Sequence, residues 1–157
     1  MKEARSLSAG YAGLPRNGGI AMAIYPSPEQ FQELLASSEE GPVVMVNLLR
    51  YKPRADAPDS GLTGEEAYQR YAEAMVPFVE SRGGRVIWTG RLTSQVIGTG
   101  GEDFHTIAVV EYPSRKAFVE IAMDPFVAGI GAHRAAGLEM QWLLATTAER
   151  EGSQVAG

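Results

Sequence analysis

Strand-like and helical segments follow one another in a restrictive order: strand, helix, strand, strand, helix, strand. The strands are expected at residues 43–49, 85–97, 105–112 and 138–146, and the helices at 63–81 and 114–123. The βαββαβ order is typical of the ferredoxin-like split unit, in which two helices cover one face of a four-stranded antiparallel sheet. We therefore predict an α+β, ferredoxin-like fold, with an N-terminal helix after Ser27-Pro28 that lies outside the repeat.

Cap residues mark where each helix begins. Short polar side chains precede the helical segments and can accept a hydrogen bond from an orphan amide of the first turn; these are Ser27, Thr63, Ser114 and Asp124. Pro77 falls inside the long helix and should kink or split it. Asp124-Pro125 should begin only a short helical turn, closed by Gly137.

Composition excludes several kinds of site. Among the 157 residues there is no Cys, so disulfides, thiolate metal sites and a Cys nucleophile are excluded. His105 and His133 are the only two His, which is too few for a three-His zinc site within one chain. We expect no metal and no cofactor. A net charge of −5 disfavours nucleic acid and anionic membrane as partners.

The ends of the chain differ from its middle. Residues 1–21 have turn chemistry without an apolar period, so we expect a flexible N-terminal extension, with Met22 as a candidate start. Residues 22–146 form the single predicted domain, and residues 147–157 a polar C-terminal tail. Neither a signal peptide nor an apolar run of membrane-spanning length occurs, and the expected location is cytoplasmic.

Three short stretches of the chain are distinctive: MVNLLRYK at residues 45–52, the Gly-Gly after the long helix, and EYPS at 111–114. With the segments around them they resemble the DUF1330 family, an uncharacterised group within the dimeric α+β barrel superfamily. The resemblance covers about residues 22–146. It implies a ferredoxin-like protomer that pairs into a dimeric barrel, but no established activity, because this superfamily supports many unrelated reactions.

The strand at residues 43–49 is apolar on both faces. We expect its face with Val44, Val46 and Leu48 to pack on the helices. The alternate face would then lie away from the helices and carry the apolar side chains Val43, Met45, Leu49, Ile107 and Val109. Because this is too much apolar surface to leave in water, we predict a homodimer with the two sheets packed face to face.

Three polar residues fall on that same predicted face. Asn47, His105 and Glu111 could line one mixed cavity, joined by Gln141, Arg85 and Thr89 from the other strands. A His and a Glu in an apolar cleft are candidate general acid–base groups, and an Asn amide can orient a carbonyl or stabilise an oxyanion. Asn47, His105 and Glu111 are thus the candidate catalytic residues.

A structural interpretation competes for each of them. Asn47 would satisfy a neighbouring backbone group, Glu111 would pair with an Arg at the end of the sheet, and His105 would be exposed at the mouth of the hairpin. His133 has an adequate explanation as a cation near a helix end.

Arg50, Tyr51 and Trp88 are the candidate ligand-binding residues. Arg50 and Tyr51 end the first strand, where a guanidinium could take a ligand carboxylate, and Trp88 could stack on an aromatic compound. The alternatives are a solvated strand end and a core aromatic.

The predicted function is binding of a small organic acid or aromatic compound, with cofactor-free proton transfer or oxygenation as the chemistry such a cavity would support. A non-catalytic dimeric ligand-binding or interaction module is the alternative. The sequence leaves open whether the protein is an enzyme.

Overall fold

A computed structural model describes residues 23–149, and the predicted extension and most of the predicted tail lie outside this range. The elements in chain order are α2 (Pro28–Ala36), β1 (Val43–Tyr51), α3 (Gly64–Ser81), β2 (Arg85–Arg91), the 3₁₀ turn η1 (Gly101–Asp103), β3 (Thr106–Tyr112), α4 (Arg115–Ala122), α5 (Pro125–Gly137) and β4 (Leu138–Thr146). The strands form one antiparallel sheet in the order β2-β3-β1-β4. This is the topology of the ferredoxin-like fold, as the element order predicts.

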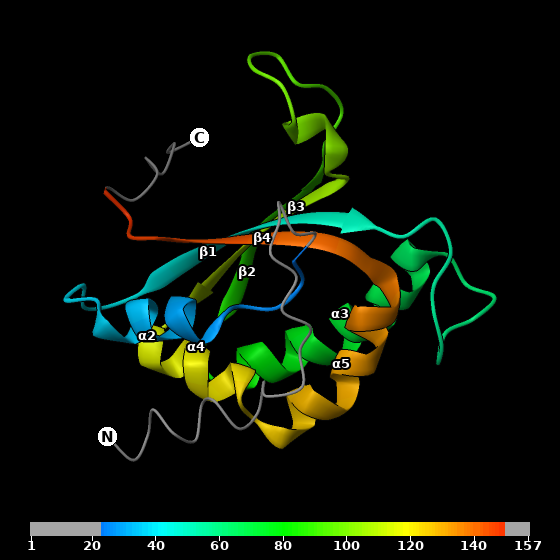
Figure 1. Cartoon of the computed structure of the whole chain (residues 1–157). Helices are drawn as coiled ribbons and strands as arrows, with labels where there is room; N and C mark the ends of the chain where they lie inside the picture. The colour runs from blue at the N-terminus through cyan, green and yellow to red at the C-terminus, as the bar shows by residue number, and fades with distance from the viewer. Residues whose placement is uncertain (1–22, 150–157) are drawn as a thin grey trace, which may run out of the picture.

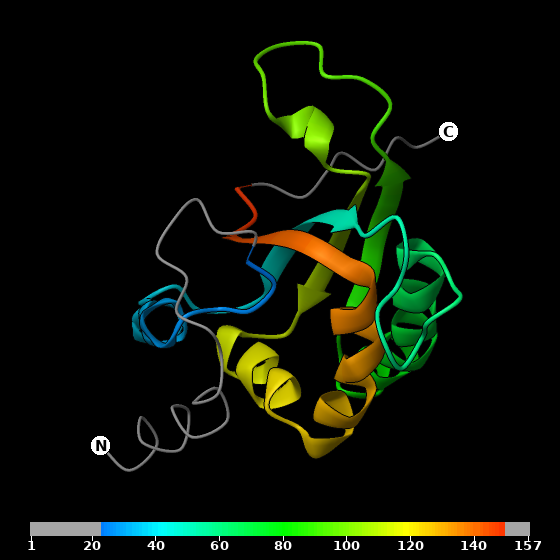
Figure 2. The same cartoon turned by 45° about the vertical axis from the view of Figure 1, so that its right-hand side comes forward.

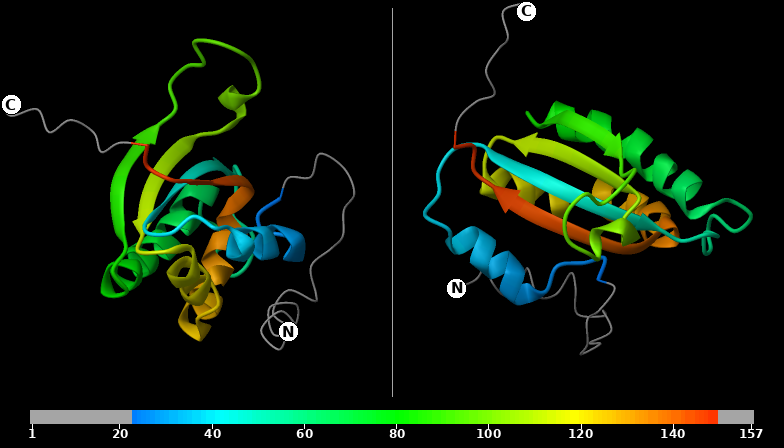
Figure 3. Two further views of the ribbon diagram at one scale, coloured as in Figure 1. Left: turned by 90° about the vertical axis from the view of Figure 1, so that its left-hand side faces the viewer. Right: turned by 90° about the horizontal axis from the view of Figure 1, so that it is seen from above.

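The α-helices that the structure describes, α2 to α5, lie on one side of the sheet, and the connection between β2 and β3 rises on the other (Figure 1). The rotated view shows the same two layers from the side (Figure 2). Seen from above, the uncovered face presents all four strands to the viewer, while α2 lies beyond the edge strand β4 (Figure 3). None of the helices within residues 23–149 combines the length and apolarity that a membrane crossing requires.

The predicted caps are present. Ser27 Oγ accepts from Gln30 N and the Gln30 side chain bonds back to Ser27 N, which forms a capping box at α2. Thr63 and Ser114 accept from the third residue of α3 and α4, and Asp124 from the second of α5. Pro77 lies inside α3 without dividing it.

Two elements differ most in length from the sequence prediction. The short turn expected after Asp124 is a helix of 13 residues, α5, because it packs along α3. Gly137 and Gly64 permit this contact: a Cβ on Gly137 would lie 2.3 Å from Gly64 O. The second strand ends at Arg91 rather than at Ile97, and its register shifts between Val86 and Trp88 instead of at Gly90. The Trp88 ring lies over Gly90, where a Cβ would be 2.2 Å from it.

The assignment of the two faces of β1 is wrong in the sequence prediction. Val43 and Met45, 0% and 2% exposed, pack with Val79, Tyr112 and Ile121 in the core under the helices. Val44, Val46 and Leu48 lie on the uncovered face instead. Both sets are apolar, so alternation alone could not decide which set the helices cover.

Candidate functional site

A cavity of about 1110 Å³ lies between the helix-covered face of the sheet and the helices. Its volume is slightly above the range of about 300–1,000 Å³ typical of ligand sites. Its sheet-side lining includes Met45, Asn47, Tyr112, Gln141 and Leu143, and its helix-side lining includes Phe31, Leu34, Tyr71, Met75, Phe118, Ile121, Val127, Gly131, Ala132, Arg134 and Ala135. The walls are therefore largely apolar, with a few polar groups.

Small residues on α5 leave this space open. Gly131, Ala132 and Ala135 line the cavity, and a Cβ built on Gly131 would meet nothing within 4 Å. Gly129, on the same helix, is equally uncrowded but does not line the cavity.

The polar groups form a connected chain across the cavity. Arg134 on α5 donates to Gln141 Oε1 on β4, and Gln141 Nε2 donates to Asn47 Oδ1 at 2.8 Å. Asn47 Nδ2 in turn donates to Ala108 O at 3.1 Å. Asn47 thus has the satisfied amide of the structural interpretation, and it also lies in the cavity with Gln141, the neighbour that the sequence analysis named.

Arg134 is a half-buried cation with neutral partners. It also donates to Ile24 O, and its guanidinium carbon lies 5.1 Å from the centre of the Tyr25 ring. Within residues 23–149 no carboxylate forms an ion pair with Arg134. An unpaired cation in an apolar cavity favours binding of an anion, and a guanidinium matches a carboxylate geometrically.

The predicted catalytic residues do not meet in one cavity. Glu111 pairs with Val44 in the register, so it lies on the uncovered face, opposite to Asn47. There its carboxylate accepts from Arg85 Nε at 3.0 Å, the ion pair that the structural interpretation predicted at the end of the sheet. The expectation of one shared cavity is wrong because it depended on the wrong face of β1.

His105 is exposed, just before β3, and its Nδ1 accepts from Tyr51 N at 3.0 Å. A row of rings separates it from the cavity: centroid distances are 5.7 Å from His105 to Tyr51, 5.6 Å from Tyr51 to Tyr68 and 5.4 Å from Tyr68 to Tyr71. Burial raises the pKa of Tyr51 and of Tyr68, so both phenols remain neutral at physiological pH.

The predicted ligand-binding residues also lie outside the cavity. Tyr51 is buried with Leu49 and Leu138. Arg50 Nε lies 2.9 Å from a Glu139 carboxylate oxygen, and Trp88, 55% exposed, lies on the uncovered face.

His133 is held by a buried carboxylate that the sequence analysis missed. Asp59 is 2% exposed. Its Oδ2 lies 2.6 Å from His133 Nδ1, and its Oδ1 lies 2.9 Å from Arg70 NH1. The hydrogen bond with His133 lowers the pKa of Asp59. This cluster fixes the loop before α3 onto α3 and α5, and it replaces the helix-end explanation of His133.

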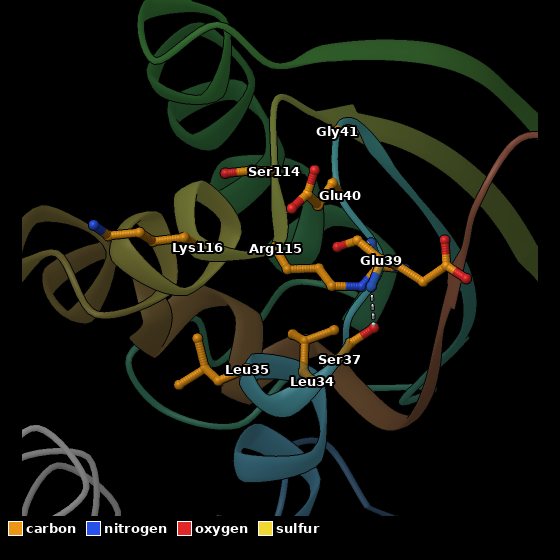
Figure 4. A pocket seen from close by; sticks show the side chains of 9 residues that line it. All are labelled: Leu34, Leu35, Ser37, Glu39, Glu40, Gly41, Ser114, Arg115 and Lys116. Atoms are coloured by element: carbon orange, nitrogen blue, oxygen red, sulfur yellow. Dashed lines mark hydrogen bonds between the residues drawn. The ribbon is translucent and has the colours of Figure 1, made fainter. Parts of the chain in front are cut away.

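A smaller hollow of about 280 Å³ lies between α2 and the start of α4 (Figure 4). Arg115 crosses it, donating to Glu39 O at 3.4 Å and to Thr147 Oγ1 at 3.0 Å. Ser37 Oγ accepts from Glu39 N at 3.2 Å. These bonds join the two helices and the end of β4, so we interpret the hollow as a structural contact between these elements rather than as a ligand site.

Arg134 is the residue of this cavity that sequence reasoning passed over. In the surrounding segment AGIGAHRAAG, residues 128–137, Arg134 is the permanently charged side chain, and His133 is charged when it is protonated. A single cation among Ala and Gly in a helix was the available signal.

The family model for a domain of unknown function, DUF1330, matches residues 60–148. The chain belongs to the DUF1330 family. The match begins in the loop before α3 and ends after β4, so it includes Arg134 and Gln141 but not Asn47 or α2.

The chain is also similar to solved structures. A protein of unknown function from Rhodopseudomonas palustris is 38% identical, with a TM-score of 0.75, and the match covers 81% of this chain and 97% of that one. A methylated form of the same protein gives the same identity and TM-score, over 83% of this chain and 97% of that one. A DABB-family protein with a ferredoxin-like fold from Mesorhizobium loti is 15% identical, with a TM-score of 0.48, over 69% of this chain and 98% of that one. No curated protein matches the chain.

Proposed function

We propose that this DUF1330 protein binds a small organic acid, aliphatic or aromatic, in the cavity under its helices. The observation that carries the proposal is Arg134, a cation without an acidic partner among the described residues, at the polar end of an otherwise largely apolar cavity. The ligand carboxylate would bind Arg134, with Gln141 as its neighbour, and the apolar body would lie against Met45, Phe118 and Ile121.

Binding without catalysis is the form of the proposal that the contacts favour. No His lines the cavity within residues 23–149, and His105 and Glu111 lie outside it. Burial raises the pKa of Tyr112, whose phenol is therefore a neutral donor rather than a base. Among the described lining residues the carboxylate is Glu33, which is exposed on α2, and the interior of the cavity offers phenols, amides and Arg134 instead of a His or carboxylate base.

Matched acids and alcohols test the proposal. Decanoic acid and 3-phenylpropanoic acid should bind at least about tenfold more tightly than decan-1-ol and 3-phenylpropan-1-ol, measured by isothermal titration calorimetry. In Arg134→Gln the acids should lose this advantage, because the charge that distinguishes them from the alcohols is gone.

Arg115→Gln is the matched control. Arg115 also lines the cavity and, like Arg134, donates to neutral groups, Glu39 O and Thr147 Oγ1. It differs in its position, because these bonds hold it in the hollow between α2 and α4, whose lining contains neither Gln141 nor Asn47. This variant should keep the preference for acids. Equal binding of acids and alcohols by the wild type, or an unchanged preference in a folded Arg134→Gln, would contradict the proposal.

We also propose that the protein is a homodimer through the uncovered face of its sheet. Directly opposed residues of neighbouring antiparallel strands share a face, and the register places these apolar side chains together: Val46, Leu48, Trp88, Ile107, Val109, Trp142 and Leu144. Trp88, Trp142 and Leu144 are 55%, 49% and 50% exposed, which is typical of an interaction surface rather than a solvated one.

Sedimentation equilibrium tests the dimer. The expected mass is twice that of the 16.9 kDa chain at micromolar concentration, and Trp88→Asp should shift the equilibrium toward the monomer because it places a charge in the apolar contact. A monomeric wild type would contradict the proposal.

A further inference from the structure

The connection between β2 and β3, residues 92–104, forms an arm that stands out from the uncovered face (Figure 1). Viewed onto that face, it crosses in front of β1 and β4 (Figure 3). The arm leaves the sheet at Leu92, whose N donates to His105 O, and returns through η1. It therefore lies on the side where the proposed second copy would pack.

The tip of the arm is apolar and exposed to solvent. Val96 and Ile97 are 88% and 90% exposed, the highest values among the exposed large apolar residues of the described chain. Two adjacent β-branched apolar side chains held in water are unfavourable unless a partner covers them.

Internal hydrogen bonds fix the shape of the arm. Gln95 Oε1 accepts from Gly101 N at 2.7 Å and from Glu102 N at 3.1 Å, while Gln95 Nε2 donates to Ile97 O at 3.0 Å. One side chain thus joins the tip to η1. An ordered arm loses less conformational entropy on binding than a flexible one.

The base of the arm is continuous with the apolar face. Phe104, 1% exposed, packs against Trp142 of β4 in a T-shaped contact with centroids 4.9 Å apart. Arg50 follows Leu49 on β1, and its NH1 lies 3.9 Å from Asp103 Oδ1 of the arm. Arm and sheet therefore present one surface.

The sheet alone is small for a stable interface. Four strands of seven to nine residues, about 4.8 Å apart, cover a flat area of about 500 Å². A standard protein interface buries about 800 Å² on each partner. A second copy that contacts both the sheet and the arm would come closer to this area.

We propose that the arm of each protomer clasps a second copy of this chain and buries Val96 and Ile97 against it. The inference rests on the proposed dimer and adds a contact that the flat sheet does not provide. The acidic residues of η1, Glu102 and Asp103, together with the net charge of −5, favour a protein partner over an anionic membrane.

The double variant Val96→Ser/Ile97→Ser tests the arm. Its dimer dissociation constant, from sedimentation equilibrium of the full chain, should rise at least about tenfold, because two apolar side chains no longer contribute their burial. Leu35→Ser is the control, since Leu35 is 41% exposed on α2, on the helix side, and its replacement should leave the constant unchanged.

A single introduced thiol gives a second measurement. The chain has no Cys, so Val96→Cys carries one reactive thiol, and a bulky maleimide should modify it more slowly above the dimer dissociation constant than below it. Leu35→Cys should react at the same rate at both concentrations.

The outcomes separate the two proposals. A dimeric wild type whose dissociation constant is unchanged in the double variant overturns the arm contact and leaves the sheet dimer intact. A wild type that is monomeric at all concentrations overturns both. Co-sedimentation of a monomeric wild type with phosphatidylcholine–phosphatidylserine vesicles, lost in the double variant, would assign the tip to lipid and likewise overturn the arm contact.

Discussion

The two faces of the sheet have similar apolar content but different surroundings. Under the helices, Met45 is 2% exposed and Asn47, Gln141 and Arg134 form a polar chain within a cavity. On the uncovered face the same strands present Val46, Trp142 and other apolar side chains, with the Arg85–Glu111 ion pair at the end of the sheet. The comparison suggests separate tasks: ligand binding under the helices and association on the open side.

The largest expected effect comes from neighbouring residues of β1 that point to opposite faces. Met45→Ala should lower the free energy of unfolding by about 2–5 kcal/mol, because it leaves a cavity in the core. Val46→Ala should cost less than about 1 kcal/mol in the isolated protomer, since its side chain is only partly buried there. Urea unfolding at dilute concentration measures both, and a larger loss for Val46→Ala would reverse the assignment of the faces.

The helical layer that covers one face can be loosened at a single position. Gly137→Ala should destabilise the fold by about 1–3 kcal/mol, because the new Cβ would clash with backbone atoms of α3. Gly129→Ala is the control on the same helix, with open space around it, and should stabilise by about 0.5–1 kcal/mol. Equal changes in thermal midpoint for the two variants would contradict the close contact of α5 with α3.

The Asp59 cluster gives the helix side a pH dependence. Because its pKa is lowered on folding, Asp59 contributes stability above its unfolded pKa of about 3.9, and this contribution is lost as the pH falls through the folded pKa. Asp59→Asn should therefore be less stable than the wild type at pH 7, with the difference shrinking toward pH 3.

Asp56→Asn is the control for this prediction. Asp56 lies in the same loop, paired with Lys52 Nζ at 2.6 Å, but its side chain is 68% exposed. It should change stability little at either pH. A constant difference between Asp59→Asn and wild type from pH 7 to pH 3 would show that the carboxylate charge is not what stabilises the loop.

The smallest expected effect lies at the end of the open face. Glu111→Gln breaks the ion pair with Arg85, whose side chain is 67% exposed, so it should cost less than about 1 kcal/mol. Neither this variant nor His105→Ala should change ligand affinity. Glu111 lies on the opposite face of the sheet, and Tyr51 and Tyr68 separate His105 from the cavity. A large loss of ligand affinity in either variant would restore these residues as site candidates.

Local patterns predicted most of the fold, because caps and turns depend on few neighbouring residues. Ser27, Thr63 and Ser114 mark their helix starts, and β4 has the predicted bounds. The sides of the sheet could not be predicted in the same way. Val43 and Val44 are chemically identical, and only the crossing of α3 and α4 decides which of them is covered.

The candidate site was predictable only in part for the same reason. Asn47 and Gln141 do lie together, because both follow from strand alternation. Arg134 comes from a helix, and its approach to Gln141 depends on how α5 packs against the sheet. Asp59 and His133 are 74 residues apart, and no periodicity connects them.

The most direct test of ligand binding under the helices is to fill the cavity from α5. Gly131→Leu projects a side chain into the space, whereas Gly129→Leu adds the same side chain outside it. By calorimetric titration with decanoic acid, Gly129→Leu should bind as the wild type does, and Gly131→Leu should bind at least about tenfold more weakly. Equal affinity of the two folded variants would contradict the cavity as the ligand site.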